Sequence, residues 1–387
     1  MSKVEELLET YNPNGVSSIK LGDILDYEQP SKYIVSSSEY DDKYDIPVLT
    51  AGQTFILGYT DEKDGVYKAS KNNPTIIFDD FTTGHHWVDF DFKVKSSAMK
   101  MLRLKNDKSL LRYIFHSMAL VNYVPTEHSR QWISKYSQFE ISLPHVKVQE
   151  EIVKILDSFT NLIDALNEEL SLRQKQLEYY REKLLTFDDK IEFDNIRLVH
   201  IDDICNVSRG ASPRPIKNYL TQSEEGIPWI KIGDVTPFDK YIKRTNERIT
   251  KEGAQKSRLL HKGDLILSNS LSFGRPYILE IDGCIHDGWI SLSGFENYVL
   301  RDFLYEVLNT KSVQNYWTMK ANNGGAMSNL NSDIVKSTII KIPSIKVQED
   351  IVKILDSFTN LISSLKEEIA LRQKQYEYYR EKLLTFD

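Results

Sequence analysis

Two groups of side chains have residue types and spacings that could carry chemistry. Asp79 and Asp80, followed by Asp91-Phe92-Lys93, resemble the carboxylates and lysine around the catalytic metal of many nucleases. Acidic residues at this spacing are also typical of charges at strand edges. His85 and His86 are metal-ligand types, but adjacent side chains on a strand point to opposite faces, and no further ligand is near them in the sequence. The first group predicts a metal-dependent nuclease as one hypothesis, and the second predicts no metal site.

Turns rich in Thr, Ser, Asn, Gln and Arg form a second chemical feature. Asn and Gln pair with adenine edges, Arg pairs with guanine, and hydroxyl groups bind phosphates. A single residue of this kind is more often a solvated loop residue than a DNA contact. Their accumulation in two separate blocks, about residues 16–143 and 198–342, nevertheless predicts DNA recognition. In the first block the candidates are Gln53, Thr82, Thr83, His85, His86, Lys95, Ser129, Arg130 and Gln131. In the second block they are Arg209, Ser212, Arg214, Lys217, Lys231, Asn269, Ser270, Ser272, Arg275, Asn322, Asn323, Ser328 and Asn329.

The sequence lacks the motifs of the common catalytic and cofactor sites. It contains no G-x-G-x-x-G, no Walker A and no G-x-S-x-G motif, and neither Cys205 nor Cys284 has a nucleophile signature. The Asn/Asp-Pro-Pro-aromatic motif of amino-methyltransferases is approached only by Asn72-Asn73-Pro74-Thr75, which departs at the third position. These absences predict no nucleotide-binding loop, no methyltransferase base pocket and no serine or cysteine nucleophile, and they leave the metal-dependent nuclease as the one catalytic hypothesis.

Short strands and turns must position the polar loops, and both blocks are predicted to be mixed α/β. Strands are predicted at Pro74–Phe78, Ile227–Ile232 and Leu265–Ser268, each beside turn residues such as Asn, Gly and Asp. Helices are predicted over residues 107–122 and 300–317.

Each block is followed by almost the same segment. Residues 147–188 recur at residues 346–387 with a constant offset of 199, and only 7 of the 42 positions differ. The two blocks in front of these segments have little in common. The chain is therefore predicted to mount two different recognition domains on one repeated element.

The repeated segment predicts a long helix with an apolar seam. Seam residues alternate by steps of four and three over more than four heptads, without an internal Gly or Pro. Because a block lies between the copies, the chain can leave along one helix and return antiparallel along the other. Arg173 and Arg372 occupy seam positions, where a polar residue costs stability but can fix the register.

Further apolar residues flank the seam and widen it, which predicts contact with a partner as well as with the other helix. The predicted contact positions in the first copy are Ile152, Ile155, Leu156, Phe159, Leu162, Ile163, Leu166, Leu170, Arg173 and Leu177. Those in the second copy are Ile351, Ile354, Leu355, Phe358, Leu361, Ile362, Leu365, Ile369, Arg372 and Tyr376.

Bulk composition is that of a soluble globular protein. The 387 residues suffice for two domains with cores, and they carry a net charge of −7 without a strongly basic block. Binding of DNA would therefore need local basic patches or a basic partner. The absence of a long apolar run, of a signal-like start and of a cysteine framework predicts a cytoplasmic protein without membrane contact.

Several stretches resemble the specificity (S) subunit of type I restriction–modification systems, and the resemblance covers essentially the whole chain. In the first block it is carried by PVLTAGQTFILGYT at 47–60 and FDDFTTGHHWVDFDFKVKSSAMKML at 78–102. In the second half it is carried by GIPWIKIGDV at 226–235, KGDLILSNSLSFGRPYIL at 262–279 and KVQEDIVKILDSF at 346–358.

The resemblance implies an α+β fold in which two mixed α/β target-recognition domains are joined by two long antiparallel coiled-coil helices with pseudo-two-fold symmetry. The boundaries expected from it are 1–144 for the first target-recognition domain and 145–188 for the first spacer helix. A linker and the second domain are expected over 189–343, and the second spacer helix over 344–387.

The resemblance also implies a non-catalytic subunit of a host-defence complex, which reads one half of a bipartite, asymmetric site in double-stranded DNA with each domain. The helices would set the gap between the halves and dock two methyltransferase (M) subunits, and two restriction (R) subunits would join. S-adenosylmethionine, ATP and Mg²⁺ would be bound by those partners. Two alternatives stay open: a stand-alone nuclease using Asp79, Asp91 and Lys93, and a coiled-coil adaptor that binds proteins and no DNA.

Overall fold

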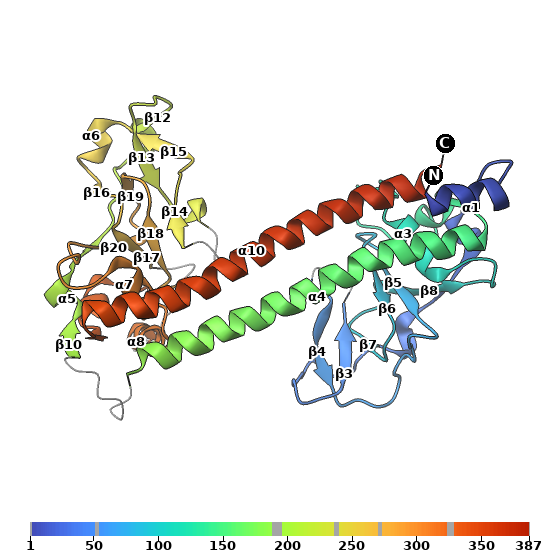
Figure 1. The fold of residues 1–387 in the computed structure, drawn as a ribbon, viewed down its shortest axis with the longest axis horizontal. Helices are drawn as coiled ribbons and strands as arrows, with labels where there is room; N and C mark the ends of the chain where they lie inside the picture. The colour runs from blue at the N-terminus through green and yellow to red at the C-terminus, as the bar shows by residue number, and fades with distance from the viewer. Residues whose placement is uncertain are drawn as a thin grey trace. The chain divides into compact units, whose positions relative to one another are not determined.

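Two compact units make up this protein in the computed structural model, which describes residues 2–50, 54–187, 196–235, 240–269, 273–322 and 329–386 (Figure 1). The first unit comprises Met1–Asn167 with Glu367–Asp387, and the second comprises Glu168–Lys366. Both divisions fall inside the longest helices, α4 (Val146–Leu185) and α10 (Ile345–Leu384). Each unit therefore holds one block and one half of each long helix. In the described ranges, no helix combines the length and apolar character needed to cross a membrane.

The first unit contains a four-stranded antiparallel sheet in the order β2-β8-β5-β6 and a three-stranded sheet in the order β4-β3-β7. Its strands are β1 (Ser17–Lys20), β2 (Leu25–Glu28), β3 (Ile46–Leu49), β4 (Ile56–Thr60), β5 (Thr75–Asp79), β6 (His85–Val88), β7 (Lys93–Val94), β8 (Met99–Leu104) and β9 (Glu140–Leu143). Its shorter helices are α1 (Lys3–Tyr11), α2 (Leu21–Ile24) and α3 (Leu111–Met118). Every residue of β5 is buried, because both faces of this central strand are covered.

The second unit contains two five-stranded sheets, ordered β11-β20-β17-β18-β14 and β12-β15-β13-β19-β16. Its strands are β10 (Arg197–His200), β11 (Asn206–Arg209), β12 (Leu220–Thr221), β13 (Ile227–Ile230), β14 (Tyr241–Ile242), β15 (Glu247–Ile249), β16 (Arg258–Leu260), β17 (Leu265–Ser268), β18 (Pro276–Leu279), β19 (Gly283–Ile285), β20 (Trp289–Ser293) and β21 (Ile339–Ile342). Its shorter helices are α5 (Ile201–Ile204), α6 (Lys251–Ala254), α7 (Arg301–Leu308), α8 (Lys311–Asn322) and α9 (Ser332–Lys336). The three predicted strands are β5, β13 and β17, with ends shifted by up to two residues.

The predicted helix at 300–317 is divided into α7 and α8. Asn309 donates through its side-chain amide to the carbonyl of Tyr305, and the Thr310 hydroxyl donates to the carbonyl of Val307. Such side chains compete with the backbone ladder, so they end one helix and allow the next to begin at Lys311. The predicted helix at 107–122 is shorter in the structure, where it forms α3.

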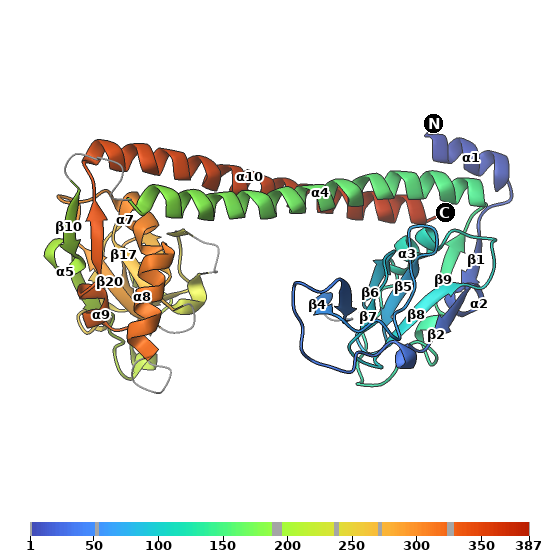
Figure 2. The same ribbon diagram turned by 90° about the horizontal axis from the view of Figure 1, so that it is seen from below.

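Each block is closed by a two-stranded antiparallel pair that brings its beginning to its end. β1 pairs with β9, and the two strands lie side by side in the first unit (Figure 2). β10 pairs with β21 in the same way in the second unit. A short helix follows the first strand of each pair, and a long helix follows the second. Both blocks therefore deliver the chain into a long helix through the same local architecture.

The long helices run antiparallel within each unit. In the first unit the rings of Phe159 and Tyr379 stack with centroids 5.2 Å apart and an interplanar angle of 21°. In the second unit Tyr180 and Phe358 stack at 5.2 Å and 20°. The two pairs consist of residues related by the offset of 199, so the helix pair has pseudo-two-fold symmetry. Each apolar core includes residues from both long helices.

A buried glutamine fastens each block to the helix that follows it. The Gln149 Oε1 atom accepts from the Leu110 backbone N–H at 3.0 Å and from the Ser109 hydroxyl at 2.8 Å. Gln348, which occupies the repeat position of Gln149, accepts from the Leu300 backbone N–H at 2.8 Å. Both glutamines have an exposed fraction of 0%, and each donates to the proline carbonyl before its helix. The same side chain thus satisfies the first backbone donor of α3 and of α7.

We expect Gln149→Leu to lower the free energy of unfolding of the first unit by roughly 1–3 kcal/mol, because it strands buried donors. Chemical denaturation measures the loss, and hydrogen exchange should locate faster opening at the start of α3. Gln174→Leu, an exposed change on the same helix, is the control. Equal effects of the two substitutions would contradict the fastening role.

Candidate nucleic-acid interface

The turn between β5 and β6 presents the first group of candidate DNA-binding residues. The Asp79 carboxylate accepts from the Phe81 backbone N–H at 2.8 Å and from the Thr82 hydroxyl at 2.7 Å, which closes the turn. Thr83 is buried in the left-handed region, with φ of 63°, a conformation that few residues other than glycine adopt. Thr82 is exposed at the tip, and β6 begins three residues later. The turn is therefore a fixed scaffold that presents a hydroxyl.

Asp80, which also forms a buried ion pair, joins this turn to the loop containing Ser129, Arg130 and Gln131. The Lys100 ammonium lies 3.0 Å from the Asp80 carboxylate, and both side chains are buried. The other oxygen of Asp80 accepts from the Trp132 backbone N–H at 2.8 Å, and the Asp80 carbonyl accepts from the Gln131 N–H. Breaking a buried pair of this kind by removing one partner leaves an uncompensated charge. The hydrogen bonds to Asp80 therefore fix two recognition loops relative to each other, and Lys100 on β8 compensates the charge of Asp80.

The candidate DNA-binding residues that are exposed on these two loops are Thr82, Ser129 and Arg130. Gln131 is fully buried, where it donates to Ser129 and accepts from the Tyr123 hydroxyl, so it shapes the loop. Lys95 lies elsewhere, after β7, where its ammonium donates to the Ser38 hydroxyl at 2.8 Å. Gln53 lies outside the described residues.

His85 and His86 point to opposite sides of β6, as predicted. The His85 ring contacts Phe115 of α3 edge-on at 5.4 Å, and the His86 ring stacks on Phe55 at 4.4 Å. Burial lowers the pKa of His85 to about 4, although hydrogen bonds from its surroundings oppose the shift. Burial also lowers the pKa of His86. Both imidazoles are therefore neutral near pH 7 and add no positive charge to the surface.

In the second unit, four candidates converge on the loop at 286–288, and the Asp287 side chain is the common acceptor of two of them. Its carboxylate accepts from the Ser212 hydroxyl at 2.9 Å and pairs with Arg214 at 3.3 Å. Partial burial alone would raise the pKa of Asp287, but the Ser212 hydrogen bond, His286 and Arg214 outweigh it and lower the pKa. The backbone carbonyl of Asp287 accepts from Arg209 and from Asn269, each at 3.0 Å.

This arrangement is a cluster of aligned donors with little net charge. Arg209 and Arg214 are exposed, Ser212 is partly exposed, and Asn269 is buried. The guanidinium groups are thus held by a carboxylate and a carbonyl while most of their surface faces solvent. Arginines fixed in this manner suit bidentate contacts with guanine or phosphate.

The remaining candidates of the second block lie apart from this cluster. Lys231 pairs with Glu247 at 2.6 Å, Lys217 is exposed on a short turn, and Asn329 is exposed beside Leu330, whose N–H donates to the Asn269 carbonyl. Arg275 lines a hollow that also contains Arg181 and Glu306. Ser270, Ser272, Asn323 and Ser328 lie outside the described residues, and Asn322 is the last residue of α8.

The set considered for a nuclease is not assembled. Asp79 serves its own turn, Asp91 pairs with Lys68 at 2.5 Å, and Lys93 is buried against Glu62 at 3.0 Å. Asp79 is the last residue of β5, Lys93 is the first residue of β7, and Asp91 lies just before β7. The two strands belong to different sheets. Over the part of the chain that the structure describes, no group of three or more His, Cys, Asp or Glu side chains could hold a metal ion. The nuclease hypothesis is not supported.

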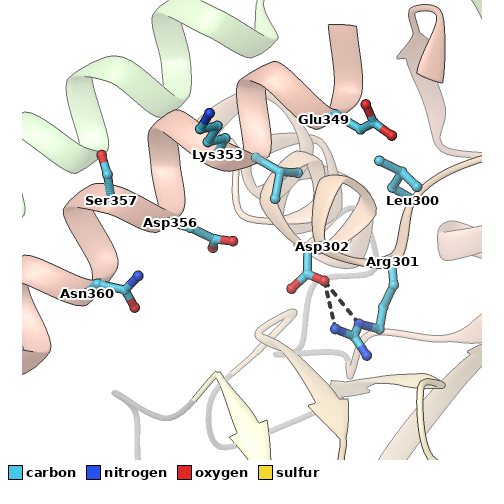
Figure 3. A pocket seen from close by; sticks show the side chains of 9 residues that line it. Leu300, Arg301, Asp302, Glu349, Lys353, Asp356, Ser357 and Asn360 are labelled. Atoms are coloured by element: carbon cyan, nitrogen blue, oxygen red, sulfur yellow. Dashed lines mark hydrogen bonds and ion pairs between the residues drawn. The ribbon is translucent and has the colours of Figure 1, made fainter. Parts of the chain in front are cut away.

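A hollow in each unit marks the junction between the block and its long helix. In the second unit it has a volume of about 610 Å³ and is lined by residues of α7 and α10 (Figure 3). Asp302 and Asp356 both line it, and Lys240 bridges them at 2.9 and 3.0 Å. In the first unit the corresponding hollow measures about 930 Å³. There Asp157 occupies the repeat position of Asp356, and it pairs directly with Arg112 at 2.7 Å.

The long helices also carry exposed apolar residues that are identical in the two copies. Leu162 and Leu361 are 39% and 38% exposed, and they occupy the same repeat position. Two further pairs at matching positions, Leu172 with Leu371 and Tyr179 with Tyr378, are more than half exposed. Each unit contains one leucine of the first pair and one member of each further pair, and we call these three exposed side chains the apolar patch of the unit. Exposed apolar surface of this kind is typical of a protein interface.

The sequence analysis did not identify Asp287, Lys100 or the two buried glutamines, Gln149 and Gln348, and it considered Asp80 only as a nuclease carboxylate. The His286-Asp287-Gly288 tripeptide is a turn signal that could have indicated the second-unit loop. Gln149 and Gln348 are identical in the two repeats, but so are most of their neighbours, so the repeat alone did not distinguish them. No local signal identifies Lys100 as buried, because its partner is twenty residues away.

Comparison with known proteins gives consistent matches. A family model described as type I restriction modification DNA specificity domain matches residues 13–173 and 194–371. The type I restriction enzyme EcoR124I/EcoR124II specificity subunit of Escherichia coli is 39% identical, over 100% of this chain and 97% of its own length. A Haemophilus influenzae chain named as a candidate type I specificity subunit is 33% identical over 86% of both. The crystal structure of a type I S subunit from M. genitalium is similar in fold, with a TM-score of 0.58 at 16% identity and 96% coverage of both chains.

The neutral histidines of the first unit make its stability dependent on pH. The folded pKa of His85, about 4, lies below the unfolded value of about 6.5, so the unfolded state binds the proton first. The stabilisation is complete above pH 6.5 and is lost as the pH falls through 6.5 toward 4. We expect thermal unfolding monitored between pH 7.5 and 5 to show this loss, and His85→Phe to reduce it. An unchanged slope in that variant would contradict the assignment.

Proposed function

Because the chain belongs to the family of type I restriction–modification DNA specificity subunits, we propose that each of its two units reads one half of a bipartite, asymmetric site in double-stranded DNA. DNA recognition is the role of this family, and its specificity subunits are non-catalytic. One observation carries the two-halves proposal: each unit has a different set of polar recognition loops beside nearly the same long helices. Nearly identical supporting helices with different loops are what two independent half-site readers require.

The recognition loops differ in how they would contact DNA. In the first unit, Ser129 and Arg130 offer a hydroxyl and a guanidinium donor, and Thr82, whose hydroxyl proton is donated to Asp79, offers a hydroxyl oxygen. Asp80 joins their two loops. In the second unit, Arg209 and Arg214 offer two guanidinium groups held by the Asp287 loop. Because the net charge is −7, the attraction to phosphates would come in part from a basic partner.

The helices would act as a ruler between the half-sites. Both α4 and α10 continue without interruption from one unit into the other, and each has 40 residues, or roughly 60 Å at 1.5 Å per residue. Adding whole turns to both helices should widen the gap between half-sites and leave the half-sites unchanged.

The partners would be two methyltransferase (M) subunits and two restriction (R) subunits. We assign one M subunit to the apolar patch of each unit, because two near-identical patches fit two copies of one partner. S-adenosylmethionine, ATP and Mg²⁺ would be bound by those subunits, which carry the chemistry. This chain would choose the DNA sequence on which that chemistry takes place.

Methylation sequencing tests the half-site proposal. DNA from cells that express this chain with its M subunit should carry a split motif, and cells without either protein should not. Arg214→Ala should relax or weaken one half only, by about 1–3 kcal/mol per lost bidentate base contact. Lys175→Ala on α4 is the control. If Arg214→Ala altered both halves of the motif, the assignment of one half to each unit would be wrong.

Aspartate substitutions test the patches. Leu162→Asp together with Leu361→Asp should abolish co-purification with the M subunit, and either single change should remove one of two copies. Native mass spectrometry of the complex measures this stoichiometry. Gln174→Glu, an exposed change on another face of α4, is the control for added negative charge. Retention of both M subunits by a folded double variant would refute the patch assignment.

A further inference from the structure

The two long helices are nearly identical, yet one of their differences is buried. The seven differing pairs are Glu151 and Asp350, Asp164 and Ser363, Ala165 and Ser364, Asn167 and Lys366, Leu170 and Ile369, Ser171 and Ala370, and Leu177 and Tyr376. Thirteen of these fourteen side chains are exposed or half-exposed, and only Tyr376 is buried, at 7% exposed. A buried difference between otherwise equivalent helices indicates that their surroundings differ at this position.

Tyr376 contacts the first block through its hydroxyl group. The hydroxyl lies 2.9 Å from Nδ1 of His116, a fully buried residue of α3, and the two rings meet edge-on with centroids 6.0 Å apart. Nε2 of His116 lies 2.9 Å from the Asp157 carboxylate, which can only accept. Nε2 therefore carries the proton, and Nδ1 accepts from Tyr376. Both ring nitrogens are satisfied only if residue 376 supplies a donor.

Surrounding charges favour the neutral form of this histidine. Burial lowers the pKa of His116, and nearby Arg112 and Arg380 act in the same direction against the opposing effect of Asp157. Burial also raises the pKa of Tyr376, so its hydroxyl keeps the proton that it donates. The guanidinium of Arg380 lies over the Tyr376 ring, 5.2 Å from its centroid.

The second unit has different residues at the equivalent positions. Glu306 stands six residues after Leu300, whose N–H is bound by Gln348, just as His116 stands six residues after Leu110. The Glu306 carboxylate is buried and accepts from Arg181, the repeat equivalent of Arg380, at 2.7 Å. Leu177, the equivalent of Tyr376, packs against the apolar core cluster of that unit. In this unit a buried carboxylate pairs with an arginine and Leu177 lines the same hollow, whereas the first unit pairs a histidine with a tyrosine.

We propose that the side chain at position 177 or 376 matches each long helix to one recognition block, with Tyr376 positioning the block that carries His116. The two helices are therefore not interchangeable, although 35 of the 42 repeated positions are identical. The matching residue for the first block is contributed by the helix that follows the second block. A block that is transferred to the other position meets the wrong partner at its buried residue.

The hydroxyl-deletion variant Tyr376→Phe provides the first test, on the full-length chain. It leaves the buried Nδ1 acceptor without its donor, and we expect the melting temperature of the first unit to fall by roughly 3–6 °C. Hydrogen exchange should show faster opening of α3, with no change in α7. Tyr379→Phe removes an exposed tyrosine hydroxyl three residues away, and it should change neither.

A double-mutant cycle separates matching from general packing. His116→Leu and Tyr376→Leu should each lower the melting temperature, and the double variant should lose less than the sum of the single losses, since no polar group is then left unpaired. Additive losses would show that the two residues act independently, and the proposal would fall.

A duplicated-block chain tests matching directly. In it, residues 16–143 replace residues 196–342, so that a second His116 faces Leu177. We expect this second copy to melt below the first, and Leu177→Tyr to restore it toward the first. Equal stability with Leu177 and with tyrosine at that position would overturn the proposal. These melting and hydrogen-exchange measurements need neither DNA nor partner subunits. Their outcome is therefore independent of whether the proposed recognition role is correct.

Discussion

The apolar seam between the two long helices is the constraint on which the rest of the structure depends. A helix with a continuous stripe of this length must bury it, and the stacked pairs Phe159–Tyr379 and Tyr180–Phe358 show how each unit does so. Because the helices are antiparallel, the start of one always meets the end of the other. Neither core is complete with residues from one half of the chain, since Tyr376 and Leu384 belong to the core of the first block.

Apart from Leu177 and Tyr376, the helices present nearly the same buried groups to both blocks, and each block contacts those groups with different side chains. The carboxylate at the repeated position 157 or 356 is met by Arg112 in one unit, while in the other Lys240 bridges Asp356 to Asp302. The position of Arg112 in α3 corresponds to that of Asp302 in α7, so the sign of the local charge is reversed and a further lysine compensates. The glutamine that holds the start of α3 or α7, in contrast, is used in the same way twice.

The seam and the repeat could be predicted because the spacing of apolar residues is enough to indicate the buried face of a helix. The antiparallel pairing followed from the block between the copies, and three strands were found within two residues of their ends. The recognition loops were harder to predict. Arg209, Ser212, Arg214 and Asn269 were selected by type, but Asp287, which organises them, was missed because its importance arises from residues far away in the sequence. Gln131 and Asn269 were selected as contacts with DNA, whereas their side chains are buried and support their neighbours.

The division of the units inside the long helices has a consequence for synthesis on the ribosome. Domains usually fold in the order in which they emerge, with the N-terminal one first. Here the second unit ends at Lys366, whereas the first unit requires Glu367 and the residues beyond it. The unit that begins to emerge first is thus the last to receive its full set of residues, and until then the apolar face of the nascent α4 half lacks its partner. Chaperones that shield exposed apolar surface would therefore engage the first half of this protein for most of its translation.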